Sequence, residues 1–250
     1  MPRGYWDWGS PDVPIASSLR GDLGELASRL GSIVYYDRIG QVVQLDSLEN
    51  GITPWRLSLT GAGSAAALSV DASRSGRYSL AETAGAVAGG SVSCTRGIQP
   101  LQDSPIGVEM SVAVTAADAA GTAVACNVTL HLFVQDGTTI KRGALKWLLP
   151  SGVVQYLDSS LVFQPSGVTV DVFHSVDHFH TLKFVMDITN GNYVRGIIDN
   201  IAIPIGGIAL PTPAGADNPD VHVSIVNDWV SGAAPVVYWD DLVVTQAEAT

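Results

Sequence analysis

Short apolar runs alternate with turn residues along most of the chain. Val, Ile, Leu and Thr dominate the runs, and Gly, Pro, Asn, Asp and Ser fill the gaps between them. Runs of this length and composition, repeated every ~8–12 residues, predict β-strands. The predicted strands are 32–36, 41–46, 54–59, 65–70, 77–82, 91–96, 106–116, 123–134, 140–147, 152–156, 161–163, 168–173, 180–187, 192–199, 201–204, 221–227 and 236–245.

Turn signals indicate how these strands connect. Asn190-Gly191 separates LKFVMDIT from NYVRGIID, which predicts a hairpin, and Asp136-Gly137 marks a second turn. Long strands joined in this way favour an all-β antiparallel sandwich over a parallel sheet. The Gly-, Pro- and Asp-rich segment 205–220 is the longest irregular stretch. It is either a functional loop or a cover over a sheet edge.

The N-terminal segment has a different pattern. Residues 19–31 carry leucines at three- and four-residue steps and end at Gly31, which predicts a short helix. Such a helix is too short to be stable alone, so it packs either on a partner or over one end of the sandwich. We therefore expect an arm and helix over 1–39 and a sandwich over 40–250. The candidate docking residues are Tyr5, Trp6, Trp8, Leu19, Leu23, Leu26 and Leu30.

Length and charge narrow the class of protein. A chain of 250 residues buries a core large enough to need no metal or disulfide. Cys94 and Cys126 are either two buried thiols, which this core size favours, or a cross-strand pair. The net charge of −11 disfavours binding to nucleic acid and to anionic membranes. Neither a signal peptide nor an apolar run of ~20 residues is visible, so we expect synthesis in the cytoplasm.

Three sequence segments, taken in order along the chain, indicate a particular kind of β-sandwich. The first is Asp46-Ser-Leu-Glu-Asn-Gly51 followed by Trp55, and the second is the segment SVDASRSGRYSL, residues 69–80. The third is VYWDDLVV, residues 237–244. In this order and spacing the chain resembles the jelly-roll carbohydrate-binding modules, with Leu48 in place of the usual Phe. The resemblance implies a jelly-roll β-sandwich.

The same resemblance implies a structural calcium ion. Carried over by position, its ligands are the side chains of Glu49, Asp71 and Asp240, with backbone oxygens near Ser47 and Arg74. Calcium takes six to eight hard oxygen ligands, which carboxylates and carbonyls provide. The alternative is that these carboxylates cap turns or face solvent.

Sugar binding in that family uses aromatic rings, which stack on sugars at little entropic cost. The candidate platforms are Trp147, Tyr156, Tyr193 and Trp229, whereas Trp55 and Trp239 lie in segments expected to be packed.

Catalytic patterns are weak. The chain has no GxSxG segment and no clear pair of carboxylates on the long central strands, so we expect no enzyme activity. His174, His178 and His180 lie close in sequence, but two histidines on one strand face do not supply the three or four ligands of a zinc site. We expect ordinary surface or loop histidines.

The first 60 residues loosely resemble accessory structural proteins of tailed phages that append such sandwiches. This implies a non-catalytic virion protein, such as a capsid decoration protein. It would be made in the host cytoplasm and would form a homo-oligomer. Its partners would be other virion proteins and a surface glycan. The alternative is a free carbohydrate-binding module or lectin-like protein, with a glycoside hydrolase less favoured.

Overall fold

A computed structural model describes residues 40–98, 104–115, 126–215, 220–232 and 235–248. The chain divides into two compact units, residues 1–38 and 39–250, and the described residues all belong to the second. The predicted arm, helix and strand 32–36 lie outside the described residues. The described part contains no helix, and therefore none that is long and apolar enough to cross a membrane.

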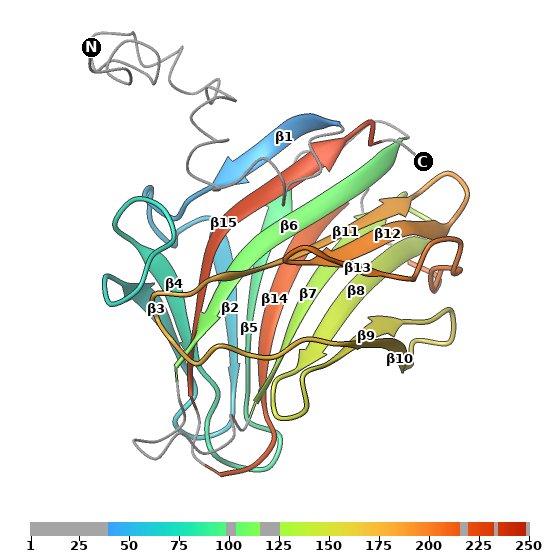
Figure 1. Ribbon diagram of the computed structural model, residues 1–250. Coiled ribbons are helices and arrows are strands. Elements are labelled where there is room, and N and C mark those ends of the chain that lie inside the picture. Colours follow the sequence, from blue (N-terminus) through green and yellow to red (C-terminus); the bar gives the residue numbers. More distant parts are fainter. Residues whose placement is uncertain (1–39, 99–103, 116–125, 216–219, 233–234, 249–250) are drawn as a thin grey trace, which may run out of the picture. The chain divides into compact units, whose positions relative to one another are not determined.

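The described residues form two antiparallel sheets (Figure 1). Sheet A has the order β13-β12-β11-β6-β15-β4-β3, and β1 also pairs with β15. Its strands are β1 (Gln41–Asp46), β3 (Ala65–Ser69), β4 (Ser79–Thr83), β6 (Pro105–Val114), β11 (His180–Asp187), β12 (Asn192–Ile198), β13 (Ile201–Ile203) and β15 (Val236–Gln246).

Sheet B has the order β10-β9-β8-β7-β14-β5-β2. Its strands are β2 (Trp55–Thr60), β5 (Ser91–Ile98), β7 (Cys126–Gln135), β8 (Ile140–Leu148), β9 (Val153–Leu157), β10 (Phe163–Thr169) and β14 (Asp220–Trp229). The predicted all-β sandwich is confirmed, and two antiparallel sheets of this kind fit a jelly roll.

The strand predictions hold closely. The observed β1 and β11 have the predicted bounds, and Gly191 adopts a φ of 70° in the turn between β11 and β12. One prediction is wrong: 161–163 and 168–173 were expected as two strands, whereas a single strand, β10, spans Phe163–Thr169. Pro165 and Gly167 read as breakers, but β10 pairs only with β9, and an edge strand accommodates such residues.

The core lies between the sheets. Sheet A contributes residues such as Met110 and Trp239, and sheet B contributes residues such as Leu130 and Trp147, all fully buried. The side chains on the other side of sheet B therefore form an outer face, on which the site described below is built.

The described part of segment 205–220 covers an edge. The backbone N–H groups of Ile140 and Arg142 donate to the carbonyls of Pro213 and Pro211, at 2.9 and 3.3 Å. The strand β9 pairs only with residues 145–148 of β8, so the loop satisfies the half of β8 that β9 leaves open.

Both cysteines are free and buried. Cys94 lies opposite Ile225 on one side of β14, and Cys126 lies opposite Trp229 on the other side. The two strands are thus two inter-strand steps apart, roughly 10 Å, and staggered by four residues, which is beyond the reach of a disulfide. The alternative of two buried thiols is the one that the structure supports.

Candidate functional site

The outer face of sheet B gathers large polar and aromatic side chains. Successive residues of a strand point to opposite faces, and in β7 the residues Val128, Leu130 and Leu132 belong to the core. His131 and Phe133 therefore point outward. The same alternation in the neighbouring strands places Arg142 and Lys146 of β8 and His222 of β14 on this face.

Strand register brings three of these side chains into one row. Phe133 lies opposite Arg142 on β8 and opposite His222 on β14. The Phe133 and His222 rings are stacked, with centroids 4.4 Å apart and planes at 21°. The Arg142 guanidinium lies 4.8 Å from the centroid of the Phe133 ring. The row is a continuous stack of one cation and two rings across three strands.

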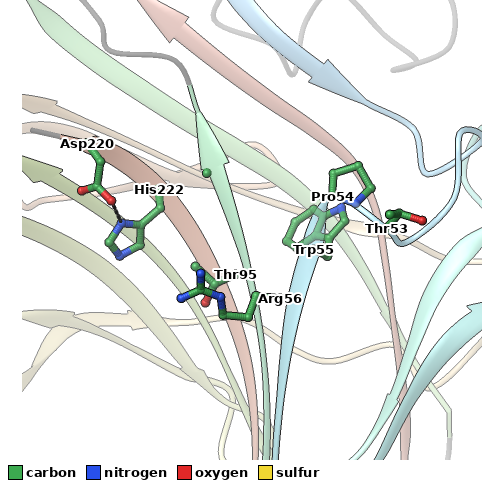
Figure 2. Close-up of a pocket in the computed structure, with 8 residues that line it drawn as sticks. Thr53, Pro54, Trp55, Arg56, Thr95, Asp220 and His222 are labelled. Atoms are coloured by element: carbon green, nitrogen blue, oxygen red, sulfur yellow. Dashed lines mark ion pairs between the residues drawn. The ribbon is translucent and has the colours of Figure 1, made fainter. Parts of the chain in front are cut away.

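Beyond His222 the row opens. The next residue across is Gly97 on β5, and a Cβ atom placed there would meet nothing within 4 Å. A pocket of about 480 Å³ lies at this position. It is lined by Thr53, Pro54, Trp55, Arg56, Thr95, Gly97, Asp220 and His222. Figure 2 shows the Arg56 side chain extending over Thr95 toward His222, while Trp55 and Pro54 form the opposite side.

A second row of side chains on this face consists of small hydroxyl residues that hydrogen-bond to one another. Ser224 hydrogen-bonds to Ser93 at 3.0 Å and accepts from the Thr95 hydroxyl at 3.1 Å. Thr95 lies opposite Arg56 on the edge strand β2. Because the small hydroxyl side chains satisfy one another, the larger groups on either side of them remain available to a ligand.

The two histidines of the face are held neutral. Burial, together with the nearby cations Arg142 and Lys146, lowers the pKa of His131 to about 3. Burial also lowers the pKa of His222, against the opposing effect of Asp220. Neutral imidazoles stack on sugars or exchange hydrogen bonds with hydroxyl groups.

Two carboxylates on these strands are already engaged. Asp228 lies 3.4 Å from the Lys146 ammonium and accepts a 2.9 Å hydrogen bond from Ser91. Asp220 lies 3.5 Å from His222 Nδ1, and Figure 2 shows this pair at the pocket edge.

Two of the predicted sugar platforms are inaccessible. Trp147 is completely buried, and its indole N–H donates to the Gly152 carbonyl at 3.1 Å. Tyr193 is 1 % exposed and its hydroxyl donates to the Leu157 carbonyl at 3.0 Å. A buried ring cannot stack on a ligand, so these two residues leave the candidate set. Tyr156 and Trp229 are half-buried, and Tyr156 packs against the core.

The predicted calcium ligands accept hydrogen bonds from backbone N–H groups or from a neighbouring hydroxyl. Within the described ranges, no group of three or more His, Cys, Asp or Glu side chains is placed to hold a metal ion. Glu49 accepts backbone hydrogen bonds from Arg77 and Tyr78 at 2.6 and 2.8 Å. Asp240 accepts from the N–H groups of Arg74 and Ser75 at 2.7 and 3.2 Å.

The third predicted ligand, Asp71, lies apart from the buried carboxylates. It is exposed and contacts the Ser69 hydroxyl at 3.1 Å. Asp241 is the residue beside Asp240 in the interior, and burial and this neighbour raise the pKa of Asp240 to about 7.

His174 and His178 are exposed loop residues, as expected, but the expectation of a surface or loop residue is wrong for His180, which begins the buried strand β11. His180 is 1 % exposed, and Asp199 lies 2.7 Å from its Nδ1. Its Nε2 accepts a 3.2 Å hydrogen bond from the Phe173 backbone N–H. With both nitrogens engaged, His180 has no lone pair to offer a metal.

Sequence reasoning missed Arg56, His131, Phe133, Arg142 and His222. A signal was present in the segments CNVTLHLFVQ and VHVSIVND, where residues of one parity are aliphatic and residues of the other include His, Phe and Ser. Such strands present an aliphatic face to a core and a functional face outward.

Neither family models nor curated proteins match this chain. Several solved structures match it in fold. The protein titled "Cellulose induced protein, Cip1" matches with a TM-score of 0.54 at 19 % identity, over 81 % of this chain and 96 % of that one. An endo-β-1,4-glucuronan lyase from the fungus Trichoderma reesei matches with a TM-score of 0.51 at 10 % identity, over 76 % and 90 %.

A carbohydrate esterase from the Shiga toxin-encoding bacteriophage phi24B matches with a TM-score of 0.50 at 15 % identity, over 83 % of this chain and 99 % of that one. Carbohydrate-binding modules are also among the matched structures. The chain thus shares its β-sandwich fold with the cellulose-induced protein, the lyase and the esterase. At these identities the likeness concerns the fold alone.

Proposed function

We propose that this protein binds glycans without cleaving them, on the outer face of sheet B. The observation that carries the proposal is the row formed by Arg142, Phe133 and His222, which leads into the pocket beside Gly97. Rings offer apolar area to the C–H faces of a sugar, and the flanking hydroxyl, imidazole and guanidinium groups match its hydroxyl groups. The fold shared with glycan-active proteins supports this choice of ligand class.

The carboxylates on this face support the choice of binding over catalysis in this proposal. Glycoside hydrolysis needs two carboxyl groups that flank the scissile bond. Of the carboxylates on the strands of this face, Asp228 lies in an ion pair with Lys146, and Asp220 lies 3.5 Å from the neutral His222 ring. The stack and the pocket provide contacts for a ligand, and no pair of free carboxyl groups accompanies them among the described residues.

The test is a glycan array followed by titration calorimetry. Phe133→Ala removes the middle of the stack, and Gly97→Leu places a side chain in the pocket from a position where an added Cβ atom meets nothing within 4 Å. We expect each variant to lose at least about tenfold in affinity with an unchanged melting temperature. Phe173→Ala is the matched control, since Phe173 is a 58 % exposed aromatic residue outside sheet B. Undiminished binding by both site variants would refute the site.

We further propose that the chain is a structural component of a tailed-phage virion, as the N-terminal sequence pattern suggests. Tyr5, Trp6, Trp8 and the leucines of 19–30 lie outside the described residues, so the sequence alone supports this role. Deleting residues 1–31 tests it. We expect loss of incorporation into particles and of self-association, with glycan binding retained. Normal incorporation of the truncated chain contradicts the proposal.

A structural calcium ion stays a proposal from the family resemblance. The buried neighbours Asp240 and Asp241 would gain from a cation, and Glu49 bonds to the backbone of residues 77 and 78, close in sequence to residues 74 and 75 that bond to Asp240. Calcium titrated into chelator-treated protein is expected to raise the melting temperature. The absence of a shift refutes the ion.

A further inference from the structure

The distribution of cations on the molecule is uneven. The chain has a net charge of −11 and only 13 lysine and arginine residues. Three of these cations, Arg56, Arg142 and Lys146, lie on the outer face of sheet B. Lys146 pairs with Asp228, and Asp220 pairs with His222. Among the described residues, neither Arg56 nor Arg142 forms an ion pair.

Of these two arginines, Arg142 gives the stronger indication of the ligand's charge. Its Nε is buried and has no hydrogen-bond partner, and its Nη2 is 3.4 Å from His131 Nδ1, which is long for a hydrogen bond. Burial lowers its pKa, and no carboxylate is close enough to counter that effect. Stacking on Phe133 holds the plane of the guanidinium in place. The buried Nε is out of a ligand's reach, so the terminal Nη groups of this fixed, half-buried guanidinium are the donors that match a carboxylate.

Arg56 marks the other end of the face. It lies on the edge strand β2 at the pocket, where it lowers the pKa of His222. Four inter-strand steps separate β8 from β2, which corresponds to roughly 19 Å. A linear ligand that crosses the strands therefore meets a cation at both ends and the neutral imidazole of His222 between them.

We propose that the glycan bound by this face is acidic and carries uronate carboxylates, one of which is recognised by Arg142 and a second by Arg56. This inference rests on the proposed glycan-binding function and adds the ligand class. An acidic ligand would be repelled by most of this protein's surface. The unpaired arginines supply the local attraction that overcomes that repulsion.

Pairs of acidic and neutral oligosaccharides test whether this face prefers a charged ligand. β-linked glucuronate oligomers and glucose oligomers of the same linkage differ only in a carboxylate or a hydroxymethyl group at C6, and further acidic and neutral pairs extend the panel to other linkages. By titration calorimetry, we expect an acidic member to bind at least about tenfold tighter than its neutral counterpart. Added salt should reduce this difference, because it screens the partly exposed charges.

Substitutions of Arg142 test whether this residue recognises the carboxylate of the ligand. Arg142→Met keeps the aliphatic stem and should lose at least about tenfold in affinity for the acidic oligomer, with little change for the neutral one. Arg142→Lys keeps the charge without the planar fork and should be intermediate. Arg77→Met is the matched control, since it removes the same charge from an exposed residue outside sheet B.

The outcomes separate the two proposals. Equal binding of the neutral and acidic members, or an unchanged affinity of Arg142→Met for the acidic one, overturns the ligand class while glycan binding stands. If no member of the panel binds, both proposals fail.

Discussion

The Trp239 indole N–H donates a 2.9 Å hydrogen bond to Glu82 Oε2 in the interior of the sandwich. Both residues are completely buried, and they lie on the paired strands β15 and β4. The other carboxyl oxygen of Glu82 has no hydrogen-bond partner, although the Cys94 thiol also interacts with this carboxyl group. A carboxyl group in such a place is more stable protonated than ionised.

Glu82 is expected to make stability depend on pH. Burial raises its pKa from 4.5 to about 8. The folded state therefore holds a proton that the unfolded state releases, so this stabilisation is complete below pH 4.5 and is lost as the pH rises toward 8. Glu82→Gln keeps the acceptor for Trp239 without the ionisation, and should be more stable than wild type above pH 8 by about 5 kcal/mol. Melting temperatures across this range, with Asp177→Asn as an exposed control, measure it; parallel profiles for Glu82→Gln and wild type contradict the assignment.

His131 is expected to have the opposite dependence. Its pKa is lowered from 6.5 to about 3, so the unfolded state takes up a proton that the folded state refuses. Stability is thus lost as the pH falls from about 6.5 toward 3. His131→Gln should flatten the acid limb of the melting-temperature profile. A variant that loses stability on acidification as steeply as wild type shows that another group is responsible.

Asp46 anchors the first turn of the sandwich. It accepts 2.9 Å hydrogen bonds from the Trp55 indole and the Leu48 backbone N–H, and it is paired with Arg96. Asp46→Ala leaves several donors without an acceptor at a site that is 6 % exposed. We expect a loss of about 3 kcal/mol in the free energy of unfolding. Asp177→Ala, at an exposed position outside any proposed site, should lose less than about 0.5 kcal/mol in the same denaturant titration.

The two thiols are expected to be unreactive in the folded protein. Burial raises the pKa of both Cys94 and Cys126 far above the usual value, and β14 separates their strands. A thiol reagent should modify neither residue under native conditions and both after denaturation, as mass spectrometry would report. Modification of the native protein at the rate of a free thiol would be incompatible with this packing.

Several features of the fold are readable in the sequence because they are local. The β-branched run of 180–187 and the Asn190-Gly191 turn predict β11 and its hairpin, since backbone preference and turn geometry act within a few residues. The same holds for β1 and for most strands between them. The break wrongly predicted within β10 shows the limit of such signals, because Pro165 and Gly167 are tolerated there only by virtue of the strand's position at a sheet edge.

Only the tertiary structure decided which side chains form the face. Period-two alternation is the same for either side of a sheet, so Trp147 and Phe133 look equally suited to stack on a ligand. Trp147 is buried in the core, whereas Phe133 points outward. Phe133 stacks on His222, which lies 89 positions further along the chain and is placed opposite Phe133 by strand register. Likewise, local sequence cannot show that the carboxylates of Glu49 and Asp240 turn toward the backbone N–H groups of residues 74–78. Sequence determines strands and turns through short-range preferences, whereas long-range pairing and burial select the partner of each side chain.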